Sequence, residues 1–454
     1  MKILLYAEPT LLFSVDPLMI HVHFYRWLAK ELLYHHDIEI KTIVSELAVK
    51  QNEKNHLLDI LHPISFKTQY LQQLFPQAHS VREMFLKVFN EAFSKRQHSL
   101  FQRIIKQLLP THWEPDIVVT FPIHNGLLKH VFPNALHFVE ENAIFSRPPF
   151  CRTLRFDPIH YLNGFLNKYE NEIRNFKISP EQKQKLELFK SQLRQLIDKH
   201  NPLKKELQTL KKKFHHLVLC PIPTDNSYKE TYYDDQYLYL LHLLRKIPTD
   251  IGLIITFHDS VSSQLNATVI RQLQKIYPNL IWHPVSDNSF ISQSLMYFNY
   301  VDAIINMHTM TGTQALLWDV KVISLDKRYS KWFCDKQDLD NLNEFLTQPR
   351  ADKSSLLYWY LTHFTVFEQN CNTPGWYYNF FKTKLAAFRA HGITFDLYQP
   401  QNDFDTLSTY ILDYVKDYYR PWSAGKRVLI QVWLDNQKRI HSLVKIWKKI
   451  LQYF

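Results

Sequence analysis

Four polar residues follow predicted strands and could carry acid–base or nucleophilic chemistry. Glu140 and Glu141 come after the apolar letters LHFV, Asp225 after LVLCPIPT, and His258 after GLIITF. Functional residues of open α/β sheets collect where strands give way to loops. A carboxyl group there can exchange a proton with a hydroxyl or attack a sugar's anomeric carbon, and a histidine can hold a negatively charged group. The structural alternatives are solvated loop carboxylates, a helix cap and a hydrogen-bonded loop histidine.

A turn rich in threonine is predicted within the stretch NMHTMTGTQALLWDVKVISLD, residues 306–326. It lies between a short apolar strand and the apolar helix start ALL, and it contains Thr309, Thr311, Gly312, Thr313 and Gln314. The chain has only 7 glycines, which indicates a backbone role for Gly312. The N–H groups at a helix start attract anions, and hydroxyls add donors. The turn therefore predicts a phosphate site, with a plain helix cap as the alternative.

Composition indicates a folded protein with anionic partners. With 454 residues, 46% hydrophobic and 21% charged, the chain is long enough for two or three domains. Its net charge of +11 favours anionic partners. The basic residues are dispersed and match no nucleic-acid-binding module, so we expect no nucleic acid.

The sequence signals neither a metal centre nor a membrane span. Its 4 cysteines are widely spaced without a CxxC pair, so neither zinc nor a disulfide framework is indicated. No apolar run is long enough for a spanning helix, and Glu8 and Pro9 interrupt the N-terminal apolar residues where a signal peptide would continue. Dinucleotide, P-loop and zinc-protease motifs are also absent. We therefore expect a cytoplasmic protein that uses no metal and no cofactor.

Alternating strands and helices predict two doubly wound α/β domains. The first domain, residues 1–164, alternates strands such as KILLYAE and DIVVTFP with helices. Residues 165–213 are charged and helical, and they form either a connection between domains or a surface hairpin. The second domain spans residues 214–350, and the helical C-terminal region 351–454 ends in the basic segment KRIHSLVKIWKKILQYF. Two such domains facing each other across a cleft would bring the carboxyl ends of their strands together.

The order of these motifs resembles that of bacterial capsule-polysaccharide glycosyltransferases. There, a Ser/Thr-Gly turn with xALL, a short spacer and a strand close a nucleotide-sugar site, as in TGTQALLWDVKVISLD here. Upstream, VEENAIFSRPPFCRTLRFDP, residues 139–158, resembles the glutamate-bearing loop of the retaining β-Kdo transferases of capsule and O-antigen synthesis. The resemblance covers residues 115–330, and each motif alone is loose.

The resemblance implies a GT-B-like fold of two Rossmann-like domains and a donor such as CMP-Kdo, which is a substrate rather than a cofactor. In that family a carboxylate attacks the sugar with loss of CMP, and a glutamate activates the acceptor hydroxyl. Asp225 matches the nucleophile and His258 the histidine near the donor. Glu141 matches the acid/base better than Glu140, because the following NAIFSR aligns best from there. The phosphate-binding turn is matched by Thr309, Thr311, Gly312 and Thr313.

Three departures from the family pattern leave the donor sugar open. Gln314 stands where many relatives have an acid, His308 where a small polar residue is common, and TFHDS lacks the proline that often follows the histidine. We still expect Gln314 to lie at the donor site. The expected activity is transfer of a sugar to a cell-surface polysaccharide or glycolipid precursor, with the basic C-terminus contacting an anionic membrane face.

Two alternatives remain at this point. In the first, the donor is a UDP- or GDP-sugar and the transferase inverts, so that Glu141 is a plain base and Asp225 binds substrate. In the second, the protein is a non-catalytic carbohydrate- or nucleotide-binding component of polysaccharide assembly.

Overall fold

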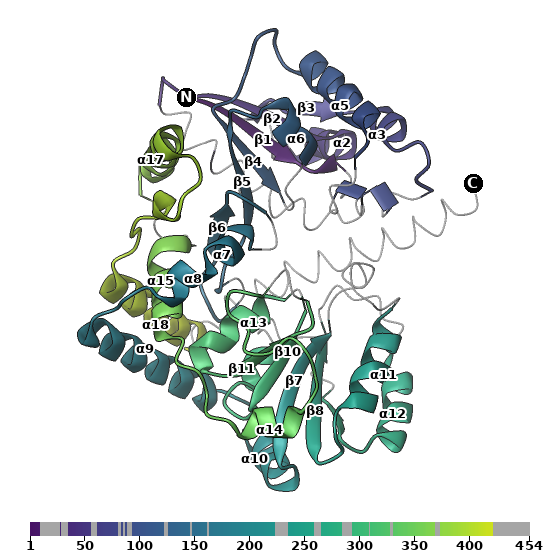
Figure 1. Ribbon diagram of the computed structural model, residues 1–454, viewed down its shortest axis with the longest axis vertical. Coiled ribbons are helices and arrows are strands. Elements are labelled where there is room, and N and C mark those ends of the chain that lie inside the picture. The colour runs from purple at the N-terminus through teal and green to yellow at the C-terminus, as the bar shows by residue number, and fades with distance from the viewer. Residues whose placement is uncertain are drawn as a thin grey trace.

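The computed structural model of the 454-residue chain contains two α/β domains, the first at the top of Figure 1 and the second at the bottom. The residues that it describes are 1–9, 28, 35–55, 61–79, 83–84, 87–88, 93–121, 126–145, 148–160, 163–222, 235–257, 265–283, 293–307, 309–326, 330–367 and 373–420. Within these residues, no helix is both long and apolar enough to cross a bilayer.

The first domain is built on a 7-stranded sheet in the order β12-β6-β5-β4-β1-β2-β3. The five neighbouring strands β5, β4, β1, β2 and β3 are parallel. In contrast, β6 pairs antiparallel with β5 and with β12. The bounds are β1 Lys2–Ala7, β2 Glu39–Ser45, β3 Ile64–Phe66, β4 Ile117–Phe121, β5 Leu136–Asn142, β6 Thr153–Asp157 and β12 Val366–Phe367.

Helices cover both faces of this sheet, which explains why its central strands are apolar at consecutive positions. On one face, residues of α3 and α5 pack against alternate residues of β1 and β4. On the other face, α17 from the C-terminal part of the chain packs its aromatic residues on β5 and β6. The bounds of the helices in and on this domain are α2 Glu46–Asn55, α3 Thr68–Leu74, α5 Lys95–Leu108, α6 Gly126–Val131 and α17 Trp376–His391.

The second domain is built on a fully parallel 5-stranded sheet in the order β11-β10-β7-β8-β9. Both faces are again covered, by α11 and α12 on one side and by α9 and α10 on the other. The bounds are β7 His216–Ile222, β8 Ile251–Phe257, β9 Leu280–Trp282, β10 Ala303–Asn306, β11 Lys321–Ser324, α11 Gln236–Lys246, α12 Ala267–Ile276, η4 Gln293–Met296, α13 Met310–Gln314, η5 Ala315–Trp318 and α14 Leu342–Thr347.

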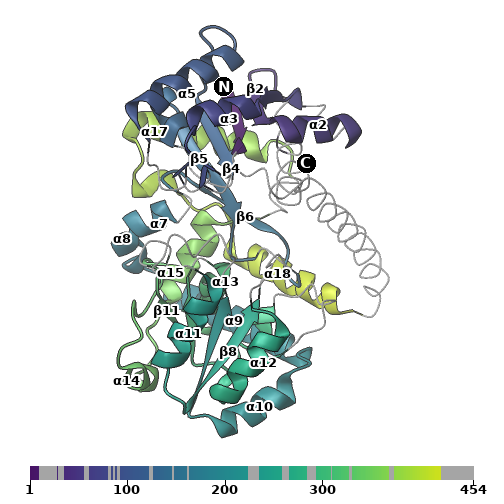
Figure 2. The same cartoon turned by 90° about the vertical axis from the view of Figure 1, so that its right-hand side faces the viewer.

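Most of the remaining helices connect the two domains along one side of the molecule, whereas α10 lies at the far end of the second domain (Figures 1 and 2). The long helix α9 packs against α18 and is tied to the second domain by ion pairs of Lys190 and Arg194 with Asp319, each at 2.6 Å. The bounds are α7 Gly164–Lys168, α8 Glu170–Arg174, α9 Pro180–Lys199, α10 Lys204–Lys213, α15 Ser354–Trp359, the π-helix η6 Tyr360–Phe364, η7 Phe395–Leu397 and α18 Phe404–Tyr419.

The two doubly wound sheets give the chain a GT-B-like architecture of two Rossmann-like domains, as expected. The chain passes from the first domain to the second and then returns, because β12 and α17 join the first sheet after the second domain is complete. This return was not expected, since residues 351–454 were predicted only as a helical region. It makes the first domain discontinuous in sequence.

Two local expectations differ from the structure. Strand β5 does not end before the two glutamates but continues through Asn142, because the antiparallel strand β6 pairs with it there. The threonine-containing segment is not an open turn before a helix. It is itself the short helix α13, with Thr309 as its N-cap residue, followed by η5.

Candidate functional site between the two domains

Glu141 lies on β5 directly opposite Arg155 of β6. Side chains that face each other across an antiparallel pair stand on the same side of the sheet, so the carboxylate and the guanidinium are neighbours. Arg155 is buried, with 1% of its surface exposed, whereas Glu141 is partly exposed. The backbone N–H of Asn142 donates a hydrogen bond of 2.7 Å to Oε1 of Glu141. The carboxyl group is thus held in place on the face of the sheet that it shares with Arg155.

The electrostatic surroundings give Glu141 a pKa near neutrality. Burial raises its pKa from the ordinary 4.5 to about 7, because the surrounding protein disfavours the charged form. The positive charge of Arg155 and the N–H of Asn142 oppose this rise, and the charge of Glu140 adds to it. A carboxyl group that titrates near pH 7 can both accept and donate a proton under physiological conditions.

Tyr360 lies near Glu141 and Arg155 and comes from the C-terminal part of the chain. It begins the π-helix η6, a rare backbone form that often occurs at functional sites. The side chain is fully buried and stacks on Trp332, with ring centroids 5.1 Å apart. Burial raises the pKa of Tyr360 to about 12, and the charges of Arg155 and Glu141 both act on its hydroxyl. Glu141 therefore shares a polar cluster with Arg155 and Tyr360.

Glu140 lies on the opposite face of the sheet from Glu141. It pairs with Phe156, whose ring belongs to the core beneath α17. Its side chain is fully buried, and its Oε1 lies 3.9 Å from Nη2 of Arg152. An acid/base group must reach its substrate. The partly exposed side chain of Glu141 meets that condition better than the buried side chain of Glu140.

The carboxyl end of β10 shapes the threonine segment of the second domain. Asn306 is the last residue of β10 and is fully buried. Its Oδ1 accepts a hydrogen bond of 2.8 Å from the hydroxyl of Thr309. A Cβ atom on Gly312 would lie only 2.6 Å from Cγ and Nδ2 of Asn306. Gly312 therefore leaves room for the Asn306 side chain, which is a packing reason rather than the backbone conformation that we expected.

The other predicted donor-binding residues of this segment differ in accessibility. Thr311 is partly exposed, so its hydroxyl can meet a ligand. Thr313 is fully buried, and its hydroxyl has no hydrogen-bond partner among the described residues. Gln314 is also buried, and its Nε2 donates a hydrogen bond of 3.0 Å to the carbonyl oxygen of Ile144. That bond places α13 against the segment that follows Glu141, so both halves of the candidate site meet at the domain interface.

We expect Gly312→Ala to destabilise the protein, because the added methyl group clashes with Asn306. Overpacking of this kind costs about 1–3 kcal/mol of the free energy of unfolding. Denaturant unfolding of the variant measures the loss, with the neighbouring change Thr311→Ala as the control. Adding Asn306→Ala to Gly312→Ala should restore part of the loss. If Gly312→Ala unfolds like the parent, the packing account of this glycine is wrong.

Two predicted residues, Asp225 and His258, lie outside the described residues, as does His308. Their assigned roles stay predictions. Among the described residues, no group of three or more His, Cys, Asp or Glu side chains is arranged to hold a metal ion.

Three residues of this region were missed in the sequence. Arg155 had a usable signal, because it is a charged residue in the alternating strand TLRFDP. Asn306 had a weaker one, as the polar end of the apolar strand AIIN. Tyr360 had none, because it reaches the site only through the return of the C-terminal chain to the first domain.

The fold and these residues define a two-domain protein of GT-B-like architecture. Solved structures with a similar layout include the β-Kdo 2,7 transferase of Thermosulfurimonas dismutans KpsC, with 11% identity, 81% of this chain and 92% of that chain covered, and a TM-score of 0.40. The KpsC β-Kdo 2,4 transferase has 12% identity, 75% and 96% coverage and a TM-score of 0.36. UDP-GlcNAc 2-epimerase of Methanocaldococcus jannaschii, in complex with UDP-GlcNAc and UDP, has 11% identity, 79% of this chain and 98% of that chain covered, and a TM-score of 0.30. No protein-family model and no curated protein sequence matches the chain.

Proposed function

We propose that the protein is a glycosyltransferase that binds a nucleotide-sugar donor between its two domains. The observation that carries this proposal is the hydrogen bond from Gln314 to Ile144. Gln314 follows the partly exposed Thr311 in α13, and Ile144 follows the strand that bears Glu141, so this bond supports one site that contains both. In the proposed site, a carboxyl group that titrates near pH 7 acts together with hydroxyl and amide donors, as sugar transfer requires.

Within this site, the roles follow from charge and accessibility. Glu141 takes the proton of the acceptor hydroxyl as that hydroxyl attacks the sugar. Arg155 and Tyr360 hold the Glu141 carboxylate in position from their buried places behind it. Thr311 donates a hydrogen bond to the donor phosphate. Asp225 is the nucleophile of a retaining mechanism, and His258 contacts the donor.

The donor that we propose is CMP-Kdo, and the acceptor is a cell-surface polysaccharide or glycolipid precursor. Both come from the resemblance of the sequence motifs to the β-Kdo transferases. We also propose that the enzyme works in the cytoplasm and that its basic C-terminal segment, outside the described residues, contacts an anionic membrane face. An inverting transferase with a UDP- or GDP-sugar is the second candidate. It keeps Glu141 as base and needs no covalent intermediate.

A donor screen tests the proposal. A ligand that binds only the folded state raises the apparent stability, by about 2.7 kcal/mol at a hundredfold excess over its Kd. We expect one of CMP, UDP and GDP to raise the melting temperature of the full chain, and CMP to do so most. The same increase should disappear when a bulky residue fills the site, as in Thr311→Trp. If no nucleotide changes the melting temperature, the proposed function is wrong.

Thr311→Ala is expected to weaken donor binding without unfolding the protein. A hydrogen bond to a charged phosphate contributes about 1.5–3 kcal/mol, which corresponds to roughly ten- to hundredfold in Kd. Calorimetric titration of the nucleotide found in the screen measures this difference. The control is Thr347→Ala, which removes an exposed hydroxyl that bonds only the Glu344 carbonyl oxygen in the described structure. Equal affinity of Thr311→Ala and the parent would show that Thr311 does not contact the donor.

A further inference from the structure

The amino ends of the strands in the second sheet form a basic edge. In a doubly wound domain the helices run antiparallel to the strands, so the last turns of the helices lie at the amino ends of the strands. Here α10 ends in Lys211, Lys212 and Lys213, α11 ends with Arg245 and Lys246, and α12 carries Lys275 in its last turn. All six side chains belong to exposed residues. They face away from the candidate donor site, which lies at the carboxyl end of the same sheet.

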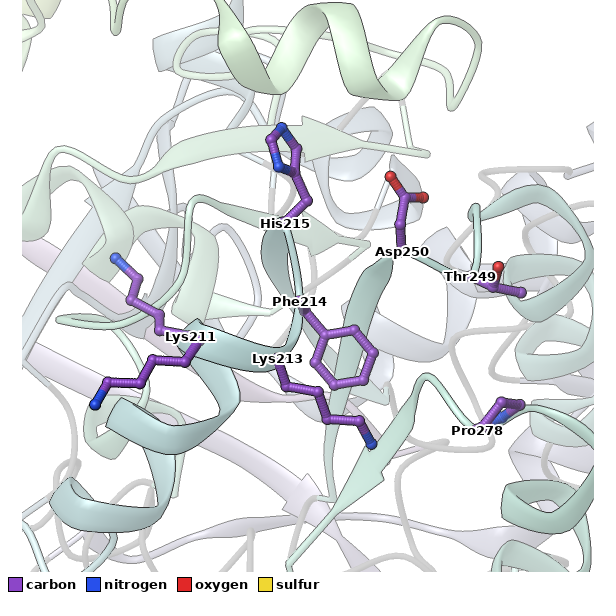
Figure 3. Close-up of a pocket in the computed structure, with 8 residues that line it drawn as sticks. Lys211, Lys213, Phe214, His215, Thr249, Asp250 and Pro278 are labelled. Carbon is purple, nitrogen blue, oxygen red and sulfur yellow. The ribbon is translucent and has the colours of Figure 1, made fainter.

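A hollow of about 700 Å³ opens on this edge. Figure 3 shows Lys213 extending from the end of α10 toward the side of Pro278, whereas Lys211 points away from Thr249 and Asp250. The lining residues are Lys211, Lys212, Lys213, Phe214, His215, Thr249, Asp250 and Pro278. Three lysines and one carboxylate line the hollow, so it carries a net positive charge.

The three lysines lack acidic partners in the described part of the chain. No carboxylate there lies within ion-pair distance of Lys211, Lys212 or Lys213, whereas Lys204 at the start of α10 pairs with Asp198 at 2.5 Å. Lys213 instead rests over the ring of the buried Phe214, with its Nζ 4.9 Å from the ring centroid. Adjacent like charges without a counter-ion repel each other, and an external anion relieves that repulsion.

An exposed apolar side chain stands beside this basic edge. Ile276 ends α12, two residues before Pro278 of the hollow, and 69% of its surface is exposed. It is the most exposed large apolar side chain of the described residues. Basic residues next to an exposed aliphatic side chain are typical of surfaces that lie on anionic membranes, since lysines contact headgroups and the apolar group enters the interface.

We propose that this edge, consisting of Lys211–Lys213, Lys275 and Ile276, docks on a bilayer of anionic phospholipids. The hollow is open and offers no buried polar side chain to specify a small ligand, which favours a broad surface of phosphates over one soluble molecule. Docking at this edge turns the far end of the second domain toward the bilayer and leaves the interface between the domains free. The inference does not depend on the sugar chemistry proposed above.

Vesicle co-sedimentation of the full chain tests the proposal. The vesicles contain phosphatidylcholine with or without phosphatidylglycerol. We expect binding to the anionic vesicles only, and weaker binding as salt increases. The triple variant Lys211→Gln, Lys212→Gln, Lys213→Gln should bind about a hundredfold more weakly, since each lysine near an anionic surface contributes about 1 kcal/mol and 1.4 kcal/mol is tenfold.

Matched controls separate this edge from general charge and from the C-terminal segment. The triple variant Lys95→Gln, Lys106→Gln, Lys129→Gln removes the same charge from exposed helices of the first domain and should bind like the parent. Ile276→Ser should weaken binding several-fold without changing its salt dependence.

Equal losses in the two triple variants, or full binding by the triple variant of Lys211–Lys213, would overturn the proposal. Binding to soluble dextran sulfate but not to anionic vesicles would overturn it as well. Donor binding should be unchanged in all variants, so the outcome is separate from that of the donor screen.

Discussion

Glu141→Gln should lower sugar transfer by about 10²- to 10⁴-fold, because an amide cannot accept the proton of the acceptor hydroxyl. Glutamine has nearly the same shape and keeps a carbonyl oxygen for the Asn142 N–H, so the site should remain folded. Donor affinity should change little, because Thr311 and not Glu141 is expected to hold the phosphate. The measurement is the initial rate of transfer together with the Kd of the nucleotide. A variant that retains activity within a few-fold of the parent would remove Glu141 from the mechanism.

The same variant should change how stability depends on pH. The pKa of Glu141 is raised in the folded protein, from 4.5 to about 7, so folding favours the protonated form. The contribution of Glu141 to the stability of the parent is therefore fully present below about pH 4.5 and is lost as the pH rises through about 7, by about 1–3 kcal/mol. Glutamine does not ionise and avoids this loss. We expect Glu141→Gln to be more stable than the parent at pH 8, with no such gain from the exposed control Glu114→Gln.

Asp225→Ala should abolish transfer while the protein remains folded. A retained configuration generally needs two displacements, the first of them onto an enzyme carboxylate. When the acceptor is absent, intact-mass analysis of the parent should show one added sugar, and Asp225→Ala should show none. If Asp225 only caps a helix, its loss costs about 1 kcal/mol of stability and leaves turnover nearly unchanged.

Asp235→Ala is the matched control for that alternative. Oδ1 of Asp235 accepts a hydrogen bond of 2.8 Å from the N–H of Leu238 and so caps α11. Its loss should reduce stability by a similar amount without affecting transfer. If both variants keep near-parental activity, the mechanism is inverting and Asp225 is not a nucleophile.

The two sheets could be predicted from the sequence because burial on both faces leaves a clear pattern. Strands such as KILLYA and IGLIITF are continuous apolar runs, as parallel strands beneath helices must be. The end of β5 could not be predicted. Its two glutamates look like a loop, and only pairing with β6 keeps them in the strand. Local sequence carries no information on that long-range partner.

Part of the candidate site stood out in the sequence, but Arg155, Asn306 and Tyr360 beside it did not. Glu141 and the threonine segment stood out because they follow apolar strand residues, at positions where functional residues of open α/β sheets collect. The contact of Gln314 with Ile144 joins residues from different domains and leaves no local signal. Gly312 was noticed for its rarity, but its reason lies in the buried side chain of Asn306, six residues earlier. The sequence pattern therefore identified Gly312 as unusual but did not identify the residue that it contacts.

The central claim is that Glu141 and Thr311 belong to one donor site between the domains. A crystal structure of the full chain with the nucleotide-sugar selected by the donor screen tests it directly. We expect the phosphate within hydrogen-bond distance, about 2.7–3.2 Å, of the Thr311 hydroxyl, and the sugar on the side of the Glu141 carboxyl group. A nucleotide bound elsewhere, such as at the amino ends of the second sheet, or a Glu141 carboxyl group out of reach of the sugar, would contradict the claim.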